Sequence, residues 1–487
     1  MKLQQSLMII MGLILFAGCK KYLSEEPKKQ ASIKTVDQLE ALVDNATAFS
    51  YITSQTAAYS TDDTEIPKAL FQNNSTAFTI DNLQYYVNSV DGVVAAATDA
   101  LWSGEFKKIF TANLILENID QVTGDDVRRQ RVKADAYFIR AYSYWVLANY
   151  YCAPYSAANL NALGLPLKKT VNYTESLKRA TLQETYDFIM SDIAEAQKVT
   201  NDDVESLRPW RVSKKAISAF LSRVYLFRGE YDQSLAQAEI ALTTATAKLV
   251  DYNTLVPGIP ASYANPAATL KYVEQNDWAA SKFLYWSEFY YTRYAYIGTQ
   301  WFVPSNGLLA LYDTQNDLRY KSFMIPNGGR RFSVVTPSAF RYTVFNDGRY
   351  IPEGPSFGEV LLNKAEVLAR KGDASEAMKT VNILRQKRMS TYTALTAIDK
   401  DDAIKKVLEE RRREMPFAMR WYDIRRLSVN DYPADNVMVV RDFFEVNLTG
   451  VNMNAPKTYT LSANRLLVPI NGVEMDASKG QIAQNPY

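Results

Sequence analysis

The stretch SKKAISAFLSRVYLFRGEYDQSLAQAEIALTTATA, residues 213–247, decides the fold class because it encodes two helices and the turn between them. Small and large apolar side chains recur every three or four residues from Ser213 to Phe227, and Gly229-Glu230-Tyr231 then interrupts the pattern. A second helical pattern follows over Ser234–Ala247. Glycine and tyrosine at the turn after an alanine-rich helix are typical of a tetratricopeptide hairpin.

The same arrangement recurs on both sides of this stretch, which indicates a repeat architecture. Periodic apolar side chains predict helices over 102–118 and 127–151. Thr181-Leu-Gln-Glu184 has the form of a capping box and predicts a helix that runs to Val199. Further helices are predicted over 359–370, 375–388 and 401–412. We therefore predict a mainly α fold, a superhelix of tetratricopeptide-like helical hairpins.

Two regions lack the helical period and set the predicted boundaries. Residues 249–355 are rich in Pro, Gly and aromatic residues, and the tail 433–487 is similarly loop-rich. Loops of this length usually carry function or are disordered, and the aromatic content argues against disorder. We expect an N-terminal helical region at 36–248, an aromatic-rich loop lobe at 249–355, and a C-terminal helical region with a loop-rich tail at 356–487.

The first residues predict export and lipid attachment. A short apolar run, Leu7–Phe16, is too short to span a bilayer and leads into Ala17-Gly18-Cys19. We predict that residues 1–18 are a signal peptide, that Cys19 carries lipid, and that 19–35 form a polar tether. An ordinary signal peptide with an incidental cysteine is the alternative. Acyl chains on Cys19 would hold the protein firmly on a membrane, because each buried methylene contributes about 0.8 kcal/mol.

The composition excludes several kinds of chemistry. The chain has 55 basic and 53 acidic residues, so its net charge of +2 gives no reason to expect nucleic acid as a partner. It has no histidine, which excludes Ser-His-Asp catalysis and histidine-containing metal sites. The second cysteine, Cys152, has no partner for a disulfide, and we expect it to be an inert core residue. We expect no cofactor, no bound metal and no catalytic residue.

Several segments together resemble the SusD/RagB family of outer-membrane nutrient-binding lipoproteins, and they span essentially the whole mature chain. In chain order they are Cys19–Pro27, Tyr59–Asp63, Leu101–Asn113, Ala134–Ala141, Glu359–Glu366, Glu410–Glu414, Arg420–Arg425, Val468–Ile470 and Gln484–Tyr487. One such motif is weak evidence, whereas their order is distinctive. The chain departs from the family pattern after its Arg-rich helix, where Phe417-Ala418-Met419 replaces the usual Phe-Glu-Gly.

The resemblance implies a function as well as a fold. It implies a body of helical hairpins, a loop-rich lobe that holds ligand, and a SusC-like TonB-dependent transporter as partner. In that pairing the lipoprotein acts as a lid on the transporter barrel. The resemblance also implies attachment to the outer membrane, with the protein displayed on the cell surface.

A dense charged segment near the end of the chain admits two interpretations. Its members are Glu410, Arg411, Arg412, Arg413, Glu414, Arg420, Asp423, Arg425 and Arg426. Arg side chains bind phosphate and carboxylate groups with two parallel bonds, which suits an anion site. We favour ion pairs between helices, because acids and bases alternate and nearly balance. The same structural interpretation applies to Arg140, Glu359 and Glu366.

Exposed aromatic rings are the leading candidates for a ligand site. A flat ring covers the apolar face of a sugar while polar neighbours bond its hydroxyl groups. The candidates in the aromatic lobe are Trp278, Trp286, Tyr290, Tyr291, Tyr294 and Trp301. The competing interpretation is that half or more of these rings pack the lobe.

Two shorter candidates lie nearer the N-terminus. Residues 72–86 combine amide groups with tyrosines, so Asn82, Tyr85 and Tyr86 suit hydroxyl recognition, although a plain polar loop is the simpler interpretation. Asp62 and Asp63 are adjacent, as catalytic or calcium-binding carboxylates can be. We expect them instead to cap the next segment or to bond a ligand hydroxyl, since such pairs are common.

Together these observations predict a surface lipoprotein that captures an oligosaccharide or polysaccharide and delivers it unchanged to a SusC-like transporter. A RagB-like peptide receptor is the first alternative, because an extended peptide could use the same tyrosines and asparagines. A tetratricopeptide-type protein adaptor and a glycosidase are the weaker alternatives.

Overall fold

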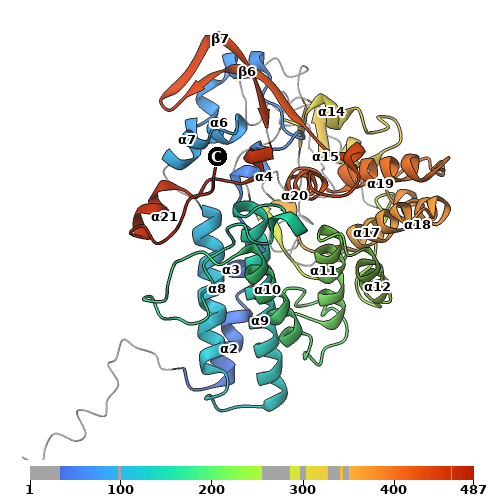
Figure 1. Ribbon diagram of the computed structural model, residues 1–487. Coiled ribbons are helices and arrows are strands. Elements are labelled where there is room, and N and C mark those ends of the chain that lie inside the picture. The colour runs from blue at the N-terminus through green and yellow to red at the C-terminus, as the bar shows by residue number, and fades with distance from the viewer. Residues whose placement is uncertain are drawn as a thin grey trace, which may run out of the picture.

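A computed structural model describes residues 33–96, 100–254, 286–296, 303–326, 341–343, 350–461 and 463–487. Helices dominate these residues, and a tall helical bundle stands beside a second group of helices, with a β-hairpin above them (Figure 1). None of the described helices combines the length and the apolar character needed to cross a membrane. The predicted mainly α fold is confirmed.

The tall bundle consists of α8 (Ala100–Asn118), α9 (Asp126–Tyr151) and α10 (Leu182–Ala196). Before α9, Gly124 adopts a φ of +146°, and the side chain of Asp125 caps the helix by accepting from the N–H of Arg128. The predicted capping box opens α10. α9 is buried over most of its length because α8 and α10 both pack on it.

Two further hairpins continue the array. α11 (Lys214–Phe227) turns at Gly229, whose φ is +75°, into α12 (Tyr231–Leu242). α12 begins and ends earlier than the predicted 234–247, because the chain leaves the helix at Thr243 and Thr244 then bonds Asp203. α17 (Phe357–Arg370) and α18 (Ala374–Gln386) form the second hairpin. These hairpins confirm the tetratricopeptide-like pattern.

Two C-terminal helices, α19 (Lys400–Glu414) and α20 (Ala418–Leu427), meet at a strained turn. The buried Phe417 between them has a φ of +65°, a conformation that is costly for a side chain with a Cβ. Its N–H donates to Oδ2 of Asp63 at 2.8 Å. A carboxylate from the N-terminal part of the chain therefore stabilises the turn at Phe417-Ala418-Met419.

Short helices surround these long ones. Near the N-terminus are α2 (Val36–Val43), α3 (Ala46–Ser50), α4 (Gln55–Tyr59), α5 (Lys68–Asn73), α6 (Ile80–Tyr86) and α7 (Val90–Ala95). Later in the chain are α14 (Asn306–Leu309), α15 (Leu318–Phe323) and α21 (Gly472–Ala477). Helices of one or two turns leave no sustained period in the sequence, and none of them was predicted.

Among the described residues, strands form three small sheets. β2 (Tyr294–Tyr296) pairs in parallel with β1 (Tyr51–Ile52) and antiparallel with β5 (Tyr350–Pro352). β3 (Met324–Pro326) and β4 (Arg341–Thr343) form an antiparallel pair, and β6 (Val439–Asn447) and β7 (Gly450–Leu461) form the long hairpin of Figure 1. The expectation of a loop-rich tail is therefore corrected. β6 is ordered on the body because Phe443 and Phe444 are buried, and the ring of Phe443 packs edge-on against Phe71.

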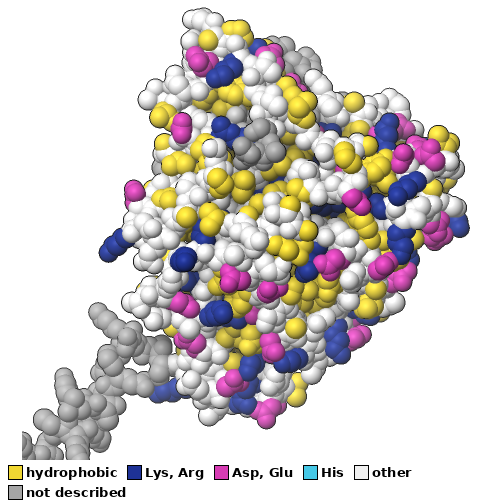
Figure 2. Space-filling view, viewed as in Figure 1, with side chains coloured by type: hydrophobic (Ala, Val, Ile, Leu, Met, Phe, Trp, Pro, Cys, Tyr) yellow, Lys and Arg dark blue, Asp and Glu magenta, His cyan; other side chains and the backbone are white. Residues whose placement is uncertain are grey.

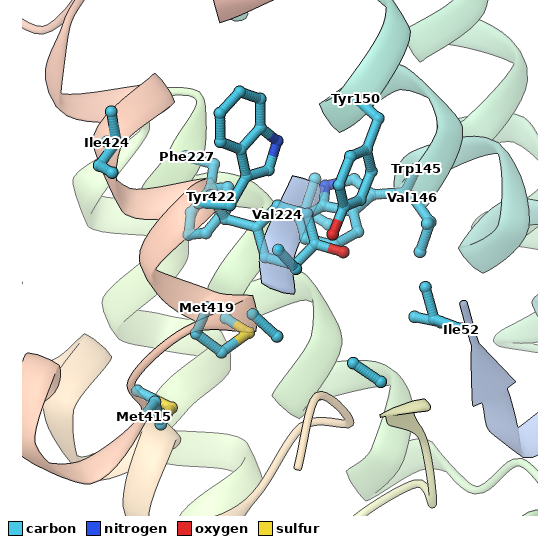
Figure 3. Packing of buried hydrophobic residues seen from close by; sticks show 14 of the residues in the cluster. Ile52, Trp145, Val146, Tyr150, Val224, Phe227, Met415, Met419, Tyr422 and Ile424 are labelled. Atoms are coloured by element: carbon cyan, nitrogen blue, oxygen red, sulfur yellow. The ribbon is translucent and has the colours of Figure 1, made fainter. Parts of the chain in front are cut away.

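Aromatic rings fill the hydrophobic core where α9, α11 and α20 meet. There Trp145, Phe227 and Tyr422 lie against one another, with Tyr150 beside them (Figure 3). Cys152, at the end of α9, is fully buried with a free thiol, as predicted. Burial raises the pKa of this thiol, which keeps it protonated and unreactive.

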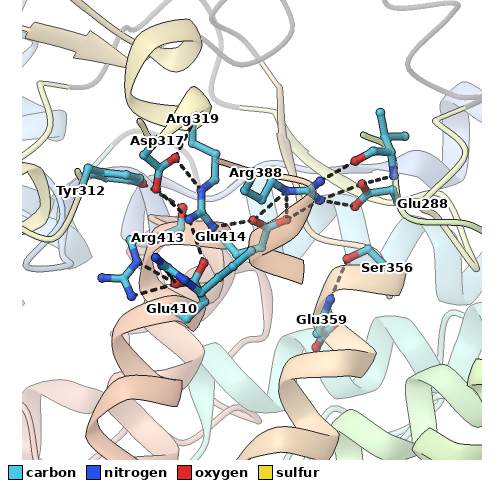
Figure 4. Close-up of polar contacts among 12 residues, drawn as sticks. Glu288, Tyr312, Asp317, Arg319, Ser356, Glu359, Arg388, Glu410, Arg413 and Glu414 are labelled. Atoms are coloured by element: carbon cyan, nitrogen blue, oxygen red, sulfur yellow. Dashed lines mark hydrogen bonds and ion pairs between the residues drawn. The ribbon is translucent and has the colours of Figure 1, made fainter. Parts of the chain in front are cut away.

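The predicted ion pairs of the C-terminal charged segment are confirmed. Arg388 bonds both Glu288 and Glu414, and Arg319 bonds Glu410 and Glu414 (Figure 4). Further buried pairs include Arg411–Asp423, Arg426–Glu366, Arg140–Asp192 and Arg223–Glu359. These charged side chains hold helices together, as the structural interpretation predicts.

Candidate functional site

Three of the predicted ligand-site or lipid-site residues lie outside the described part of the chain. They are Cys19, Trp278 and Trp301, and they remain predictions. Trp286 is described and half-buried, with its ring centroid 6.3 Å from that of Tyr252. Part of its surface is exposed, so it remains a candidate for stacking.

The tyrosines of the aromatic lobe are packing residues. Tyr290, Tyr291 and Tyr294 are at most 1% exposed. The ring of Tyr291 packs edge-on at 4.8 Å from Phe138, and that of Tyr294 packs edge-on at 4.6 Å from Tyr51. A ring without an exposed face cannot stack on a sugar, so the prediction is wrong for these three side chains.

Residues 72–86 divide into a buried helix and an exposed rim. α6 buries Asn82, Tyr85 and Tyr86, and the hydroxyl of Tyr86 accepts from the N–H of Ile66 at 3.0 Å. The prediction is therefore wrong for these three side chains as well. The segment just before α6 is exposed and polar, and Phe78 is half-buried within it. Its exposed side chains, here called the polar rim, are Gln72, Asn73, Ser75, Thr76 and Thr79.

Asp62 and Asp63 are ion-paired side chains rather than free carboxylates. Arg420 bonds both oxygens of Asp62 at 2.8 Å, and Nε of Arg412 donates to Oδ1 of Asp63 at 2.6 Å. Burial acts to raise the pKa of Asp62, but Arg420 and Arg412 outweigh it and lower that pKa to about 2. The carboxylates hold a turn and cap the start of α20, so the structure corrects the suggestion that they bond a ligand.

This turn lies beside the residues that follow the predicted Trp301. The N–H of Glu65 donates to the carbonyl of Val303 at 2.9 Å, and the hydroxyl of Ser305 donates to the carbonyl of Asp62 at 2.6 Å. The polar rim begins only a few residues after the turn, on α5. The structure thus brings together the N-terminal candidate segment and the end of the aromatic lobe, which sequence reasoning treated separately.

The polar rim consists of uncharged side chains. Lys68 of α5 pairs with Asp442 of β6 at 2.8 Å, which ties the rim to the hairpin. Over the face in Figure 2, charged side chains of both signs are interspersed among apolar and neutral ones. Such a surface suits an uncharged ligand better than a phosphate or a strongly acidic polymer.

The rim offers hydrogen-bonding groups and no reactive pair. Its amide and hydroxyl side chains both donate and accept, which matches the hydroxyl groups of a sugar. No cluster of three or more metal-ligating side chains occurs in the described ranges. The carboxylates of Asp62 and Asp63 are fixed by Arg412 and Arg420, so these two are not arranged as an acid and a base. The arrangement supports binding.

The helical hairpins define a class of protein, one built on a tetratricopeptide-like scaffold. Residues 21–226 match a family model described as "Starch-binding associating with outer membrane", and residues 357–487 match the model of the SusD family. The chain belongs to the SusD family.

Comparison with individual proteins gives the same family. Two SusD-like proteins of Formosa agariphila, P2 and P38, are each 24% identical to this chain. The first alignment covers 80% of both chains, and the second covers 67% of this chain and 72% of the relative.

Solved structures agree on the fold. A SusD superfamily protein from Bacteroides thetaiotaomicron superposes with a TM-score of 0.65 at 19% identity, covering 93% of this chain and 100% of that one. A laminarin-binding SusD-like protein superposes with a TM-score of 0.62 at 16% identity, again covering 93% and 100%. The architecture is shared well beyond recognisable sequence identity.

Proposed function

We propose that this protein is an outer-membrane receptor that binds an oligosaccharide or polysaccharide and passes it on unchanged. Membership of the SusD family carries the proposal. One family model is described as starch-binding, and one relative of known structure binds laminarin. The polar rim is compatible with such a ligand, since it presents amide and hydroxyl groups and no charged side chain that the ligand would have to neutralise.

In this proposal the polar rim bonds the hydroxyl edge of the glycan. Asn73 and Thr76 are both exposed, so their side chains can reach a ligand. Each neutral hydrogen bond contributes only about 1 kcal/mol net, so a repeating ligand gains affinity by making several such bonds. Trp286, Trp278 and Trp301 are the proposed stacking rings.

Affinity electrophoresis tests this proposal directly. Wild-type protein is run through gels that contain laminarin, starch or other polysaccharides, and we expect at least one of them to retard it. The double variant Asn73→Ala/Thr76→Ala should be retarded less in that gel, because it lacks two rim groups. Gln130→Ala, which removes an exposed amide near the start of α9, is the matched control and should migrate as the wild type does. Retardation by a peptide pool and by no polysaccharide would favour the peptide receptor instead.

We further propose that lipid on Cys19 anchors the receptor beside a SusC-like TonB-dependent transporter, to which it delivers the glycan. The short apolar run before Cys19 and the family membership support this arrangement. Cys19→Ala should leave glycan binding in solution intact while it impairs uptake by cells. Normal uptake by that variant would contradict the anchored mechanism.

A further inference from the structure

A cleft of about 500 Å³ lies along α8, away from the turn at Asp62 and the polar rim. Its floor is apolar and aromatic, with Trp102, Phe106 and Phe110 on one face of α8. The loop that connects α9 to α10 forms one wall, and the C-terminal segment around α21 forms the other (Figure 1). A volume of this size is within the range of small-molecule sites, about 300–1,000 Å³.

Buried hydrogen bonds fix both walls of the cleft. Asn113, which is fully buried on α8, donates to the carbonyl oxygens of Lys168 and Thr170 at 3.1 and 3.0 Å. Arg179, only 5% exposed, donates to the side-chain oxygen of Asn485 at 2.8 Å and so holds the C-terminal segment. The walls are therefore set before any ligand arrives, which lowers the entropic cost of binding.

Tyr173 stands at the mouth of this cleft and is 85% exposed, the most exposed aromatic side chain whose burial is described. One face of its ring is stacked on Phe110, with centroids 5.6 Å apart and planes at 24°. The other face is open to solvent. The loop is held in shape here because the side-chain oxygen of Asn172 accepts from the N–H of Thr174 at 2.9 Å. Tyr173 is thus an exposed ring on a fixed support.

The hydrogen bonds of the loop limit what the cleft can recognise. The N–H groups of residues 169 and 170 donate to the carboxylate of Glu175, and that of Val171 donates to Glu117. The N–H of Asn172 donates to the hydroxyl of Thr170. An extended peptide that adds to a strand, or an anion held by several successive backbone amides, needs free N–H groups, and those of residues 169–172 are all engaged.

Side chains on the cleft wall supply a mixed polar edge. Ser103, Lys107, Asn172 and Glu474 are among its lining residues, so hydroxyl, amide and both signs of charge are present. A wholly apolar ligand would leave these groups unused, and a strongly charged ligand would meet charges of both signs. An apolar floor beside a mixed polar edge matches a sugar ring, which has a C–H face and a hydroxyl edge.

We infer that this cleft is a second carbohydrate-binding subsite, in which the open face of Tyr173 covers a sugar ring and the cleft wall bonds its hydroxyl groups. The inference rests on the proposed function, because it assigns a second contact with the same class of ligand. The cleft and the polar rim share no residue, so each can be altered by substitutions that spare the side chains of the other.

The test uses affinity electrophoresis of the purified protein in gels that contain laminarin, starch or other polysaccharides. In each gel that retards the wild type, Tyr173→Ala should raise the apparent dissociation constant about fivefold to tenfold, the loss expected for one stacking ring. Tyr173→Phe keeps the ring and should behave as the wild type does. Tyr392→Ala, which removes a half-buried loop tyrosine outside the cleft, is the matched control.

The outcomes separate this inference from the proposed function. If a polysaccharide retards the wild type and Tyr173→Ala migrates identically, the subsite is overturned while the proposed function stands. The same result is expected if the cleft holds an apolar side chain of a partner protein. Weaker retardation of Tyr173→Ala, with Tyr173→Phe unchanged, supports the subsite. If no polysaccharide retards the wild type, both the proposed function and the subsite are overturned.

Discussion

The ion-pair network of α17–α20 and the cleft on α8 both contain residue types that often bind ligands. The network buries its arginines inside the protein, whereas the cleft leaves a tyrosine ring exposed. In the network, Arg411 is fully buried and bonds Asp423 and Asn363, so its charge is satisfied inside the protein. In the cleft, Tyr173 rests one ring face on Phe110 and leaves the other open. Residue type alone therefore does not mark a site, and the decisive property is whether the side chain is buried against partners within the fold or left open to solvent.

Removing Arg411 should disrupt the ion-pair network, and it should lower the free energy of unfolding more than any other change considered below. Arg411→Ala leaves the carboxylate of Asp423 short of a buried partner, which costs about 3–5 kcal/mol of the free energy of unfolding. Urea denaturation of the two proteins measures the loss. Lys379→Ala, which removes an exposed pair with Glu376, is the control and should change little. Equal stabilities for Arg411→Ala and the control would show that the network does not hold the helices together.

The pH dependence of stability tests the charge balance inside the same core. Burial raises the pKa of Glu353 to about 7 from an ordinary value of 4.5, although Arg223 and Arg293 act to lower it. The folded state therefore favours the protonated carboxyl of Glu353. Its contribution to the free energy of unfolding is fully present below pH 4.5 and is lost as the pH rises to about 7.

Glu353→Gln should remove this dependence, because the amide cannot ionise. The free energy of unfolding of the wild type should fall relative to the variant between about pH 5 and 7, by at most about 1.4 kcal/mol per pH unit. Denaturation curves collected across that range give the difference. A difference that stays constant with pH would contradict the raised pKa.

Substitution of Asn113 tests whether the wall of the cleft must be held in place, and it has the smallest expected effect on stability. Asn113→Ala removes two hydrogen bonds to loop carbonyls and one from Arg140, which costs about 1–2 kcal/mol. It should also loosen the loop under Tyr173 and weaken polysaccharide retardation. Asn118→Ala, which removes an amide bonded within α8 itself, serves as control for both measurements. Full retardation by Asn113→Ala would show that the loop needs no such support.

Much of the helical body could be predicted because its signals are local. The periodic apolar faces of α8, α9, α11 and α17 run for several turns, and the capping box at Thr181 marks a boundary by itself. The tail could not be predicted in this way. Its hairpin of β6 and β7 is stabilised by long-range packing, such as Phe443 on Phe71, which no local pattern reports.

The candidate site was harder to predict, and the reasons are physical. Tyr290 and Trp286 lie in the same aromatic-rich stretch of sequence. The ring of Tyr290 is nevertheless buried and that of Trp286 is half-buried, because tertiary packing decides which rings are covered. Tyr173 was missed because it is a single ring in a polar loop. The sequence can indicate the turn formed by the nearby Asn172 and Thr174. The stacking of Tyr173 on Phe110, however, depends on how the loop lies on α8.

The contact of Asp62 with Arg420, 358 residues further along the chain, bears on how the protein is made. Contacts between residues so far apart in sequence form slowly during folding, because the entropy of closing the long loop is lost before the ion pair can stabilise the chain. A chain that has not yet been synthesised as far as α19 and α20 exposes an N-terminal turn whose acids have no partner. The two parts of the chain recognised by separate family models are therefore expected to acquire their native structure together, and a truncated product would expose unpaired, aggregation-prone surface.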